Sequence, residues 1–169
     1  ADDVKIGILL GFTGPIESLT PDMASGAELA IKEASDSGAF MNGSKISSVR
    51  GDSTCVDAAA ATATAERLIT SDGVSAIMGA DCSGVTTAVL QNVATAKGVV
   101  MISPSATSPA LSTIEDNGLF FRTSPSDARQ GQILAEILRE KNIKSAAMSY
   151  TNNDYGKGLA NSIQNNFEA

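Results

Sequence analysis

The chain has 169 residues, with 12 Lys and Arg against 19 Asp and Glu, no His, a formal net charge of -7 and 4% aromatic residues. This negative charge opposes binding to nucleic acids and anionic membrane surfaces, and the scarcity of aromatic rings argues against base stacking. No apolar run reaches the roughly 20 residues that span a bilayer. Ala1-Asp2-Asp3 leads directly into an apolar strand, as in a mature exported protein after signal-peptide cleavage. These features favour an exported protein with a small-molecule ligand.

Apolar runs suited to strands alternate with Ala-rich helical stretches along the whole chain, which is typical of a parallel sheet with helices on both faces. We predict strands over residues 4–10, 45–51, 76–78, 99–102, 119–123 and 145–150. We predict helices over residues 22–37, 57–71, 83–97, 128–141 and 155–167. Two sets of apolar residues recur at helical spacing, so we expect both sets in the core: Ala24, Ala27, Ile31 and Ala34, and Ile133, Leu134, Ile137 and Leu138.

Glycines and one Ser/Pro stretch mark the boundaries between the predicted elements. Four glycines, Gly38, Gly43, Gly73 and Gly98, sit where helices should end in a left-handed residue. Residues 123–127 are different, because a Ser/Pro stretch follows an apolar strand and leads to an N-cap signal at Asp127. We predict a Rossmann-like lobe over residues 1–122, followed over residues 123–169 by a crossing and the start of a second, incomplete lobe.

In an open α/β sheet, ligands bind outside the carboxyl ends of the strands, where helix amino termini present free N–H groups. The loops at these positions, residues 11–15, 79–84, 103–109 and 151–156, are rich in Gly and hydroxyl residues. Ser83 at a helix start is suited to a carboxylate. Thr107 lies in a loop bounded by two prolines that restrict its backbone. The simpler alternative is that Ser83 caps its own helix and Thr107 belongs to an ordinary turn.

The residue types that the common catalytic sites require are missing from this sequence. Without His, neither a Ser-His nor a Cys-His nucleophile is available, and the usual His-containing catalytic zinc sites are excluded. The chain also lacks GxGxxG after its first strand and has no phosphate-binding P-loop motif. Asp52 and Asp57 suggest an acidic pocket for a metal or phosphoryl group, or simply solvated surface. We predict a binding protein and not an enzyme, with no catalytic residue, cofactor or metal.

The two cysteines, Cys55 and Cys82, permit one disulfide in an oxidising compartment, and two buried thiols are the alternative.

Several segments, each unspecific alone, occur together: residues 13–15, residues 52–58 with Cys55, the Cys82-Ser83 step, residues 102–109 and residues 154–160. In this order and at these spacings, over nearly the whole chain, they resemble the periplasmic leucine/isoleucine/valine-binding proteins, which are type I solute-binding components of ABC transporters. The resemblance implies the periplasmic-binding-protein type I fold.

The resemblance also implies roles for particular residues. Ser83 and Thr107 would hold the α-carboxylate and α-ammonium of an amino acid, helped by main-chain groups around Ser105 and Ala106. Tyr155, from the second lobe, would close over the ligand. The two cysteines match the family's disulfide positions, so a Cys55–Cys82 bridge is expected.

The function implied is a periplasmic protein that binds a branched-chain or other amino acid, or a similar small polar acid or amide, and delivers it to a membrane permease. A ligand-sensing regulatory or receptor domain of the same fold is the alternative. Family members are about twice as long, as two domains of roughly 100 to 200 residues require, so the resemblance implies a truncated second lobe. Self-association of such a fragment is a further possibility. Residues 16–21 depart from the family's small-residue pattern, so the resemblance does not determine which ligand side chain this loop contacts.

Overall fold

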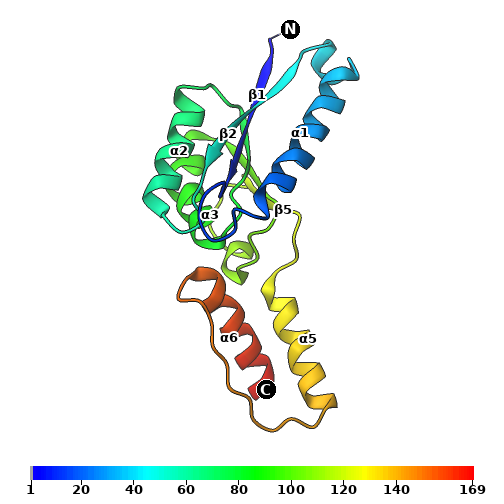
Figure 1. Ribbon diagram of the computed structural model, residues 1–169, viewed down its shortest axis with the longest axis vertical. Coiled ribbons are helices and arrows are strands. Elements are labelled where there is room, and N and C mark those ends of the chain that lie inside the picture. Colours follow the sequence, from blue (N-terminus) through cyan, green and yellow to red (C-terminus); the bar gives the residue numbers. More distant parts are fainter. Residues whose placement is uncertain (1) are drawn as a thin grey trace.

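Five parallel strands form the central sheet of the computed structural model, which describes residues 2–169 (Figure 1). The strands are β1 (Val4–Leu10), β2 (Ile46–Asp52), β3 (Ala76–Gly79), β4 (Val100–Ser103) and β5 (Phe120–Arg122), in the order β2-β1-β3-β4-β5. From β1 the chain moves to β2 on one side and then to β3 on the other, so the strand order reverses between β1 and β3. Ala1, part of the amino terminus expected of an exported protein, lies outside the described residues.

Helices connect the strands as predicted. They are α1 (Thr20–Asp36), α2 (Ala58–Thr70), α3 (Ser83–Val89), α4 (Thr95–Lys97), α5 (Asp127–Glu140) and α6 (Asp154–Glu168), with short 3-10 turns η1 (Phe40–Asn42) and η3 (Pro109–Ser112). The single helix predicted over residues 83–97 is one continuous helical segment in which α3 passes through a π-helical turn, η2 (Leu90–Ala94), into α4. Positive φ angles at the four punctuating glycines, Gly38, Gly43, Gly73 and Gly98, confirm that they end helical segments.

The alternation of β1 divides the core into two layers. Ile8 and Leu10 pack with Ala24 of α1, whereas Leu9 faces the opposite layer, formed mainly by α2 and the α3 segment. Figure 1 shows α1 on one side of the sheet and α2 with α3 on the other. Each of these three β1 side chains is fully buried, which stabilises the fold by about 1.5–3 kcal/mol per residue. The apolar face predicted for α1 is confirmed.

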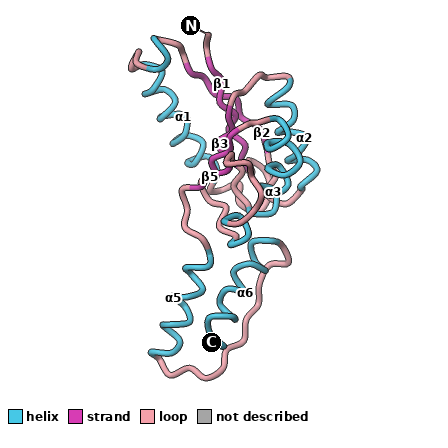
Figure 2. The backbone as a smooth tube through the Cα atoms, turned by 180° about the vertical axis from the view of Figure 1, so that it is seen from behind, coloured by secondary structure: helices cyan, strands magenta, loops and turns pink. Residues whose placement is uncertain are grey.

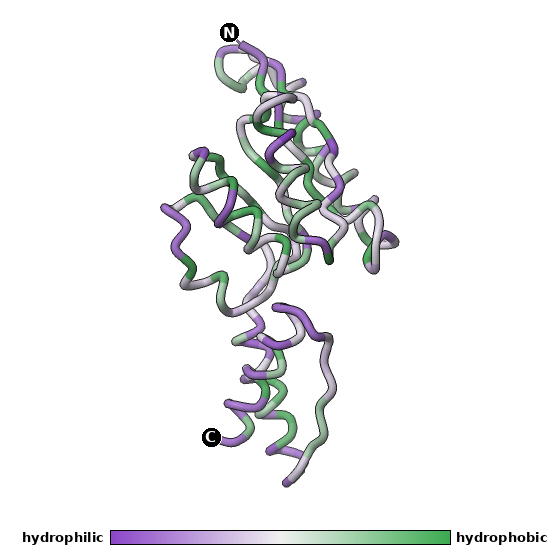
Figure 3. The backbone as a smooth tube through the Cα atoms, turned by 90° about the vertical axis from the view of Figure 1, so that its left-hand side faces the viewer, coloured by the Kyte–Doolittle hydropathy of each residue, from purple (hydrophilic) through white to green (hydrophobic). Residues whose placement is uncertain are grey.

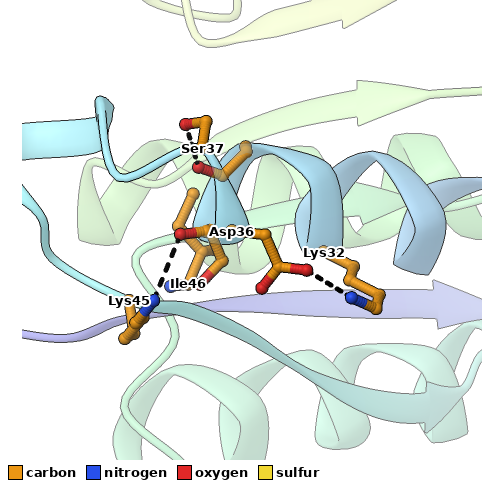
Figure 4. A network of polar contacts seen from close by, with 7 residues as sticks. Lys32, Asp36, Ser37, Lys45 and Ile46 are labelled. Atoms are coloured by element: carbon orange, nitrogen blue, oxygen red, sulfur yellow. Dashed lines mark hydrogen bonds and ion pairs between the residues drawn. The ribbon is translucent and has the colours of Figure 1, made fainter.

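The end of α1 is tied to the start of β2 at the edge of the sheet opposite the loops expected to hold a ligand (Figure 4). Ile46 donates its N–H to Ser35 Oγ at 3.1 Å, and the Lys45 ammonium donates to the Ser35 carbonyl at 3.4 Å. Lys32 pairs with Asp36 one turn later in the same helix. This network orients α1 on the sheet and lies outside the candidate site.

The prediction of a sixth strand over residues 145–150 is wrong. These residues form an exposed, extended link from α5 to α6, drawn as a long loop in Figures 1 and 2. Within residues 2–169 no strand lies beside the link to accept its backbone hydrogen bonds. A strand-like sequence becomes a strand only when a neighbouring strand pairs with it.

The helices α5 and α6 lie side by side beyond the carboxyl ends of the strands (Figures 1 and 2). They run in the same direction, because the extended link returns from the end of α5 to the start of α6. Gly131 and Ala135 of α5 are the buried residues at its contact with α6. The predicted core face of α5 is partly wrong, since Ile133 and Ile137 remain 40% and 39% exposed. The apolar stripe is wider than a single neighbouring helix covers, and Figure 3 shows hydrophobic stretches along this pair of helices.

Gly131 sets how closely α5 and α6 approach. A methyl group at Gly131 would lie 2.0 Å from Ser162 Oγ and 2.6 Å from the Ser162 carbonyl carbon, so the helices would have to separate. We expect Gly131→Ala to destabilise the α5–α6 pair by about 1–3 kcal/mol, measured as faster amide hydrogen exchange in both helices. Gly26→Ala in α1 is the matched control, because open space surrounds Gly26 and alanine there should stabilise the helix by about 1 kcal/mol. Equal effects of the two substitutions would contradict the packing argument.

Candidate functional site

The carboxyl ends of the strands point toward the α5–α6 pair (Figure 1), so the loops that leave the strands face these two helices. Because the strand order reverses between β1 and β3, a crevice is expected between the loops after these two strands. The loop after β4 lies next to the β3 loop, since β3 and β4 pair. The candidate site is therefore built from the loops after β1, β3 and β4.

Asp81 holds together the loops that follow β1, β2 and β3. Its buried carboxylate accepts hydrogen bonds from the Gly11 N–H after β1, from the Ser53 hydroxyl after β2 at 2.9 Å and from the Cys82 N–H at 2.9 Å. A carboxylate can accept several hydrogen bonds at once, so one residue fixes the relative positions of three loops. Sequence reasoning missed Asp81, although an acidic residue directly between an apolar strand and a helix start was a usable signal.

Serines join the β4 loop to the β3 loop. The Ser103 hydroxyl donates to the Ala80 carbonyl and accepts the Ala106 N–H at 3.0 Å. The Ser105 hydroxyl donates to the Asp81 carbonyl at 3.0 Å. Ala106 is fully buried behind these contacts. The structure thus brings Ser105 and Ala106 next to the segment that carries Ser83, as expected of neighbouring parallel strands.

Ser83 does not cap its own helix. Cys82 is the N-cap residue of α3 and makes no side-chain capping hydrogen bond. The buried Ser83 hydroxyl instead accepts the Ser108 N–H from the β4 loop at 3.2 Å. No acceptor within residues 2–169 takes the Ser83 hydroxyl proton, which leaves that proton free for a ligand.

Thr107 connects the β4 loop to α5. Its hydroxyl donates to Asp127 Oδ2 at 2.8 Å, and its carbonyl accepts the Asp127 N–H at 2.9 Å. The predicted N-cap at Asp127 is wrong, because Ser126 is the N-cap and accepts the Ala128 N–H at 3.1 Å. Ser126 supplies an equally good capping oxygen one residue earlier, so the Asp127 side chain is left free to face Thr107.

Arg122 supports the same loop from the end of β5. Its guanidinium donates to the Ala106 and Ser108 carbonyls at 3.2 and 2.8 Å. Burial lowers the pKa of Arg122, against the attraction of the Asp127 carboxylate. Burial also raises the pKa of Asp127, against the Thr107 hydrogen bond and the Arg122 charge. Sequence reasoning missed Arg122, since nothing local indicates which carbonyls it meets.

Tyr155 lies in the first turn of α6, directly after Asp154. It is 44% exposed on α6 and lines a surface pocket of about 410 Å³ with Met148, Tyr150 and Ile163. The helix α6 itself reaches the candidate site, because a methyl group on Gly158 would lie 3.3 Å from Ser108 Oγ. The structure therefore places the first turns of α6 against the β4 loop.

The expected disulfide is present. Cys55 and Cys82 are bonded with a Cα–Cα distance of 5.2 Å. Cys55 lies in the loop after β2, and Cys82 directly precedes Ser83. The bridge therefore limits the movement of the segment that positions Ser83.

The acidic residues near β2 have structural roles. Asp57 caps α2 by accepting the Ala60 N–H at 3.0 Å. Asp52 accepts hydrogen bonds from the Thr13 hydroxyl and the Thr54 N–H. Partial burial raises the pKa of Asp52, but these hydrogen bonds outweigh burial and hold it below its usual value. Within residues 2–169, His, Cys, Asp and Glu form no group of three or more arranged to hold a metal ion.

Comparison with known proteins identifies the family. Residues 3–169 match the family model described as periplasmic binding protein. The chain belongs to the periplasmic binding protein family. Its resemblance to leucine/isoleucine/valine-binding proteins is confirmed by relatives of that name. The Leu/Ile/Val-binding protein of Citrobacter freundii is 32% identical over 99% of this chain and 45% of its own length.

Other family members also match this chain over nearly its whole length. The leucine-, isoleucine-, valine-, threonine-, and alanine-binding protein of Pseudomonas aeruginosa is 31% identical over 99% of this chain and 44% of its own length. A branched-chain amino acid transporter substrate-binding protein of Streptococcus pneumoniae, solved with isoleucine, matches with a TM-score of 0.79 at 29% identity over 99% of this chain and 47% of that one. The chain thus spans about 45% of the length of the curated relatives that it matches.

The structural match confirms the predicted fold class of a parallel sheet flanked by helices. Across residues 2–169, no helix is both long enough and apolar enough to cross a membrane.

Proposed function

We propose that this periplasmic binding protein is the extracytoplasmic solute-binding component of an ABC transporter, and that it binds a branched-chain or other amino acid and delivers it to a membrane permease. Relatives about 30% identical carry names that specify leucine, isoleucine and valine. The Cys55–Cys82 disulfide is typical of a protein in an oxidising compartment, which supports a periplasmic location.

The hydrogen-bond polarity of two hydroxyls carries this proposal. Ser83 accepts an N–H and keeps its proton, so it can donate to the α-carboxylate of an amino acid. Thr107 has already donated its proton, so it can only accept, as an α-ammonium requires. The two residues leave neighbouring strands, β3 and β4, at the same edge of the sheet. One donor and one acceptor side by side match the two charged groups of an amino acid.

The same features favour binding over catalysis. The Ser83 hydroxyl meets a backbone N–H and no base, so nothing activates it as a nucleophile. The hydroxyls and backbone groups of the loops are instead held in fixed positions by Asp81 and Arg122. Fixed groups that replace the water shell of a polar ligand reduce the ordering cost of binding.

We propose that residues 1–122 are one lobe and residues 123–169 are the crossing and the start of a second. The sheet ends with β5 at Arg122, and α5 begins after four connecting residues. Hinge closure of the second lobe would bring Tyr155 over the ligand and form the surface that a permease recognises.

Substitutions of the two hydroxyl residues test the proposal. We expect Ser83→Ala and Thr107→Val each to weaken leucine, isoleucine or valine binding by roughly 10- to 100-fold, because each loses a hydrogen bond to a charged group worth about 1.5–3 kcal/mol. Amide chemical-shift titrations into the millimolar range measure the affinities. Ser25→Ala and Thr113→Val, at exposed positions, are the controls. Wild-type affinity in either site variant, or no amino-acid binding by the wild type, would refute the proposed site.

A further inference from the structure

The Thr107–Asp127 hydrogen bond decides what Thr107 can recognise. A hydroxyl has one proton to donate and two lone pairs to accept with, whereas an ionised carboxylate only accepts. The Thr107 proton must therefore point to Asp127 Oδ2, 2.8 Å away. What remains of Thr107 for a ligand is its accepting lone pairs. If Asp127 were an amide, it could donate to Thr107 and release the Thr107 proton toward the ligand.

Burial and backbone hydrogen bonds hold the Asp127 carboxylate in place beside the Thr107 hydroxyl. The residue is only 2% exposed. Its N–H donates to the Thr107 carbonyl at 2.9 Å, and its carbonyl accepts the Ser162 hydroxyl of α6 at 2.9 Å. Bonds on both sides of the backbone fix the direction in which the side chain leaves α5. The carboxylate and the Thr107 hydroxyl consequently form one unit.

No ion pair balances the charge of Asp127 within residues 2–169. Arg122 is the nearby cation, but its guanidinium donates to the Ala106 and Ser108 carbonyls and to the Ser112 hydroxyl. A buried carboxylate without a paired cation is costly. The Asp127 carboxylate therefore depends on hydrogen-bond donors, and the Thr107 hydroxyl is the side-chain donor that it has within residues 2–169.

We propose that Asp127 is a positioning residue that fixes Thr107 as a hydrogen-bond acceptor and thereby makes the site select ligands with an ammonium group over ligands of the same shape that lack it. The inference rests on the proposed amino-acid-binding function, and it assigns to α5 a part in ligand selection. It concerns a residue that acts through Thr107 and does not itself touch the ligand.

The test compares two ligands that differ only at the ammonium: L-leucine and 4-methylpentanoate, which has the same carbon skeleton and carboxylate. Affinities for both are measured by amide chemical-shift titration of the wild type and of Asp127→Asn. We expect the wild type to prefer leucine and Asp127→Asn to lose at least tenfold of that preference, through weaker leucine binding with little change for 4-methylpentanoate. A general loss of structure would weaken the binding of both ligands alike. The ratio of the two affinities therefore distinguishes an effect on the position of Thr107 from an effect on folding.

Two further variants sharpen the result. Asp22→Asn removes an exposed acidic residue from the first turn of α1, as Asp127→Asn does from the first turn of α5, and should leave the ratio unchanged. Thr107→Val should lose the same preference as Asp127→Asn, and adding Asp127→Asn to it should change the ratio no further. If Asp127→Asn fails to fold, Thr107→Val still tests the selection. An unchanged preference in that variant would overturn the inference.

The outcomes separate the two proposals. A wild type that binds neither compound overturns the proposed function, and the inference with it. A wild type that prefers leucine, combined with an Asp127→Asn variant of equal preference, overturns the inference alone. An additional loss when Asp127→Asn is combined with Thr107→Val would show that the charge acts directly on the ligand, and this too would overturn the role assigned to Thr107.

Discussion

Replacing Asp81 with alanine is expected to lower the free energy of unfolding by about 4 kcal/mol, because two buried donors and one partly buried donor would lose their acceptor at once and each unpaired group costs about 1–3 kcal/mol. The donors are the Gly11 N–H, the Ser53 hydroxyl and the Cys82 N–H. Since they come from the loops after β1, β2 and β3, the loss should also increase the mobility of the whole candidate site. Urea unfolding measures the stability, and amide hydrogen exchange at Gly11 and Cys82 reports the local opening.

Two controls accompany Asp81→Ala. Asp81→Asn keeps one accepting oxygen and should lose about half as much stability, since its amide N–H₂ cannot accept the remaining donors. Asp22→Ala removes an exposed carboxylate of α1 and should change stability by less than about 0.5 kcal/mol. If Asp81→Ala unfolded at the same urea concentration as the wild type, the central role of this carboxylate would be wrong.

Removing the Cys55–Cys82 disulfide is expected to cost about 3–4 kcal/mol. The bridge joins residues 27 apart in sequence. A loop of this size has a chain-entropy contribution of about 3.6 kcal/mol in the unfolded state. The double substitution Cys55→Ala and Cys82→Ala should therefore melt at a markedly lower temperature than the wild type. Thermal unfolding followed by circular dichroism, with and without dithiothreitol, measures the effect.

The reductant provides the control for the disulfide. Dithiothreitol should lower the melting temperature of the wild type toward that of the double alanine variant and leave the variant itself unchanged. Because Cys82 directly precedes Ser83, the same change should weaken ligand binding as well as stability. A wild type whose melting temperature is insensitive to full reduction would contradict the stabilising role of the bridge.

Both cross-links act on the loops and leave the sheet itself unchanged. Asp81 fixes the loops after β1, β2 and β3, and the disulfide joins the β2 loop to the start of α3. A loop at the end of a strand has few apolar contacts to hold it, so polar and covalent links must supply its rigidity. This rigidity is what allows Ser83 and Thr107 to be placed before a ligand arrives.

The sequence predicted most of the fold because its main signals are local. The alternation in β1 places Ile8 and Leu10 on one face and Leu9 on the other, and the structure divides the core in this way. Helix periodicity and the punctuating glycines placed the helix bounds to within one or two residues of those observed. Parallel strands with loops rich in Gly and hydroxyl residues also led to Ser83 and Thr107, and the family resemblance added Ser105.

Where the sequence misled, the deciding partner was distant. Residues 145–150 have the composition of a strand, but no strand lies beside them within residues 2–169. Ile133 and Ile137 have core spacing, but α6 covers only part of their face. In each case the local preference is real and the tertiary environment overrides it.

By itself, then, the sequence determined the parallel α/β architecture, the loops that carry the candidate site and the exclusion of His-dependent catalysis, because periodicity and residue inventory are properties of the chain alone. Only the tertiary structure decided the direction of the hydrogen bonds. That Asp81 gathers three loops, that Ser83 keeps its proton and that Thr107 gives its proton to Asp127 all depend on groups 20 or more residues apart in the chain. A hydroxyl can donate or accept, and which of the two it does is settled by the neighbour that folding brings to it.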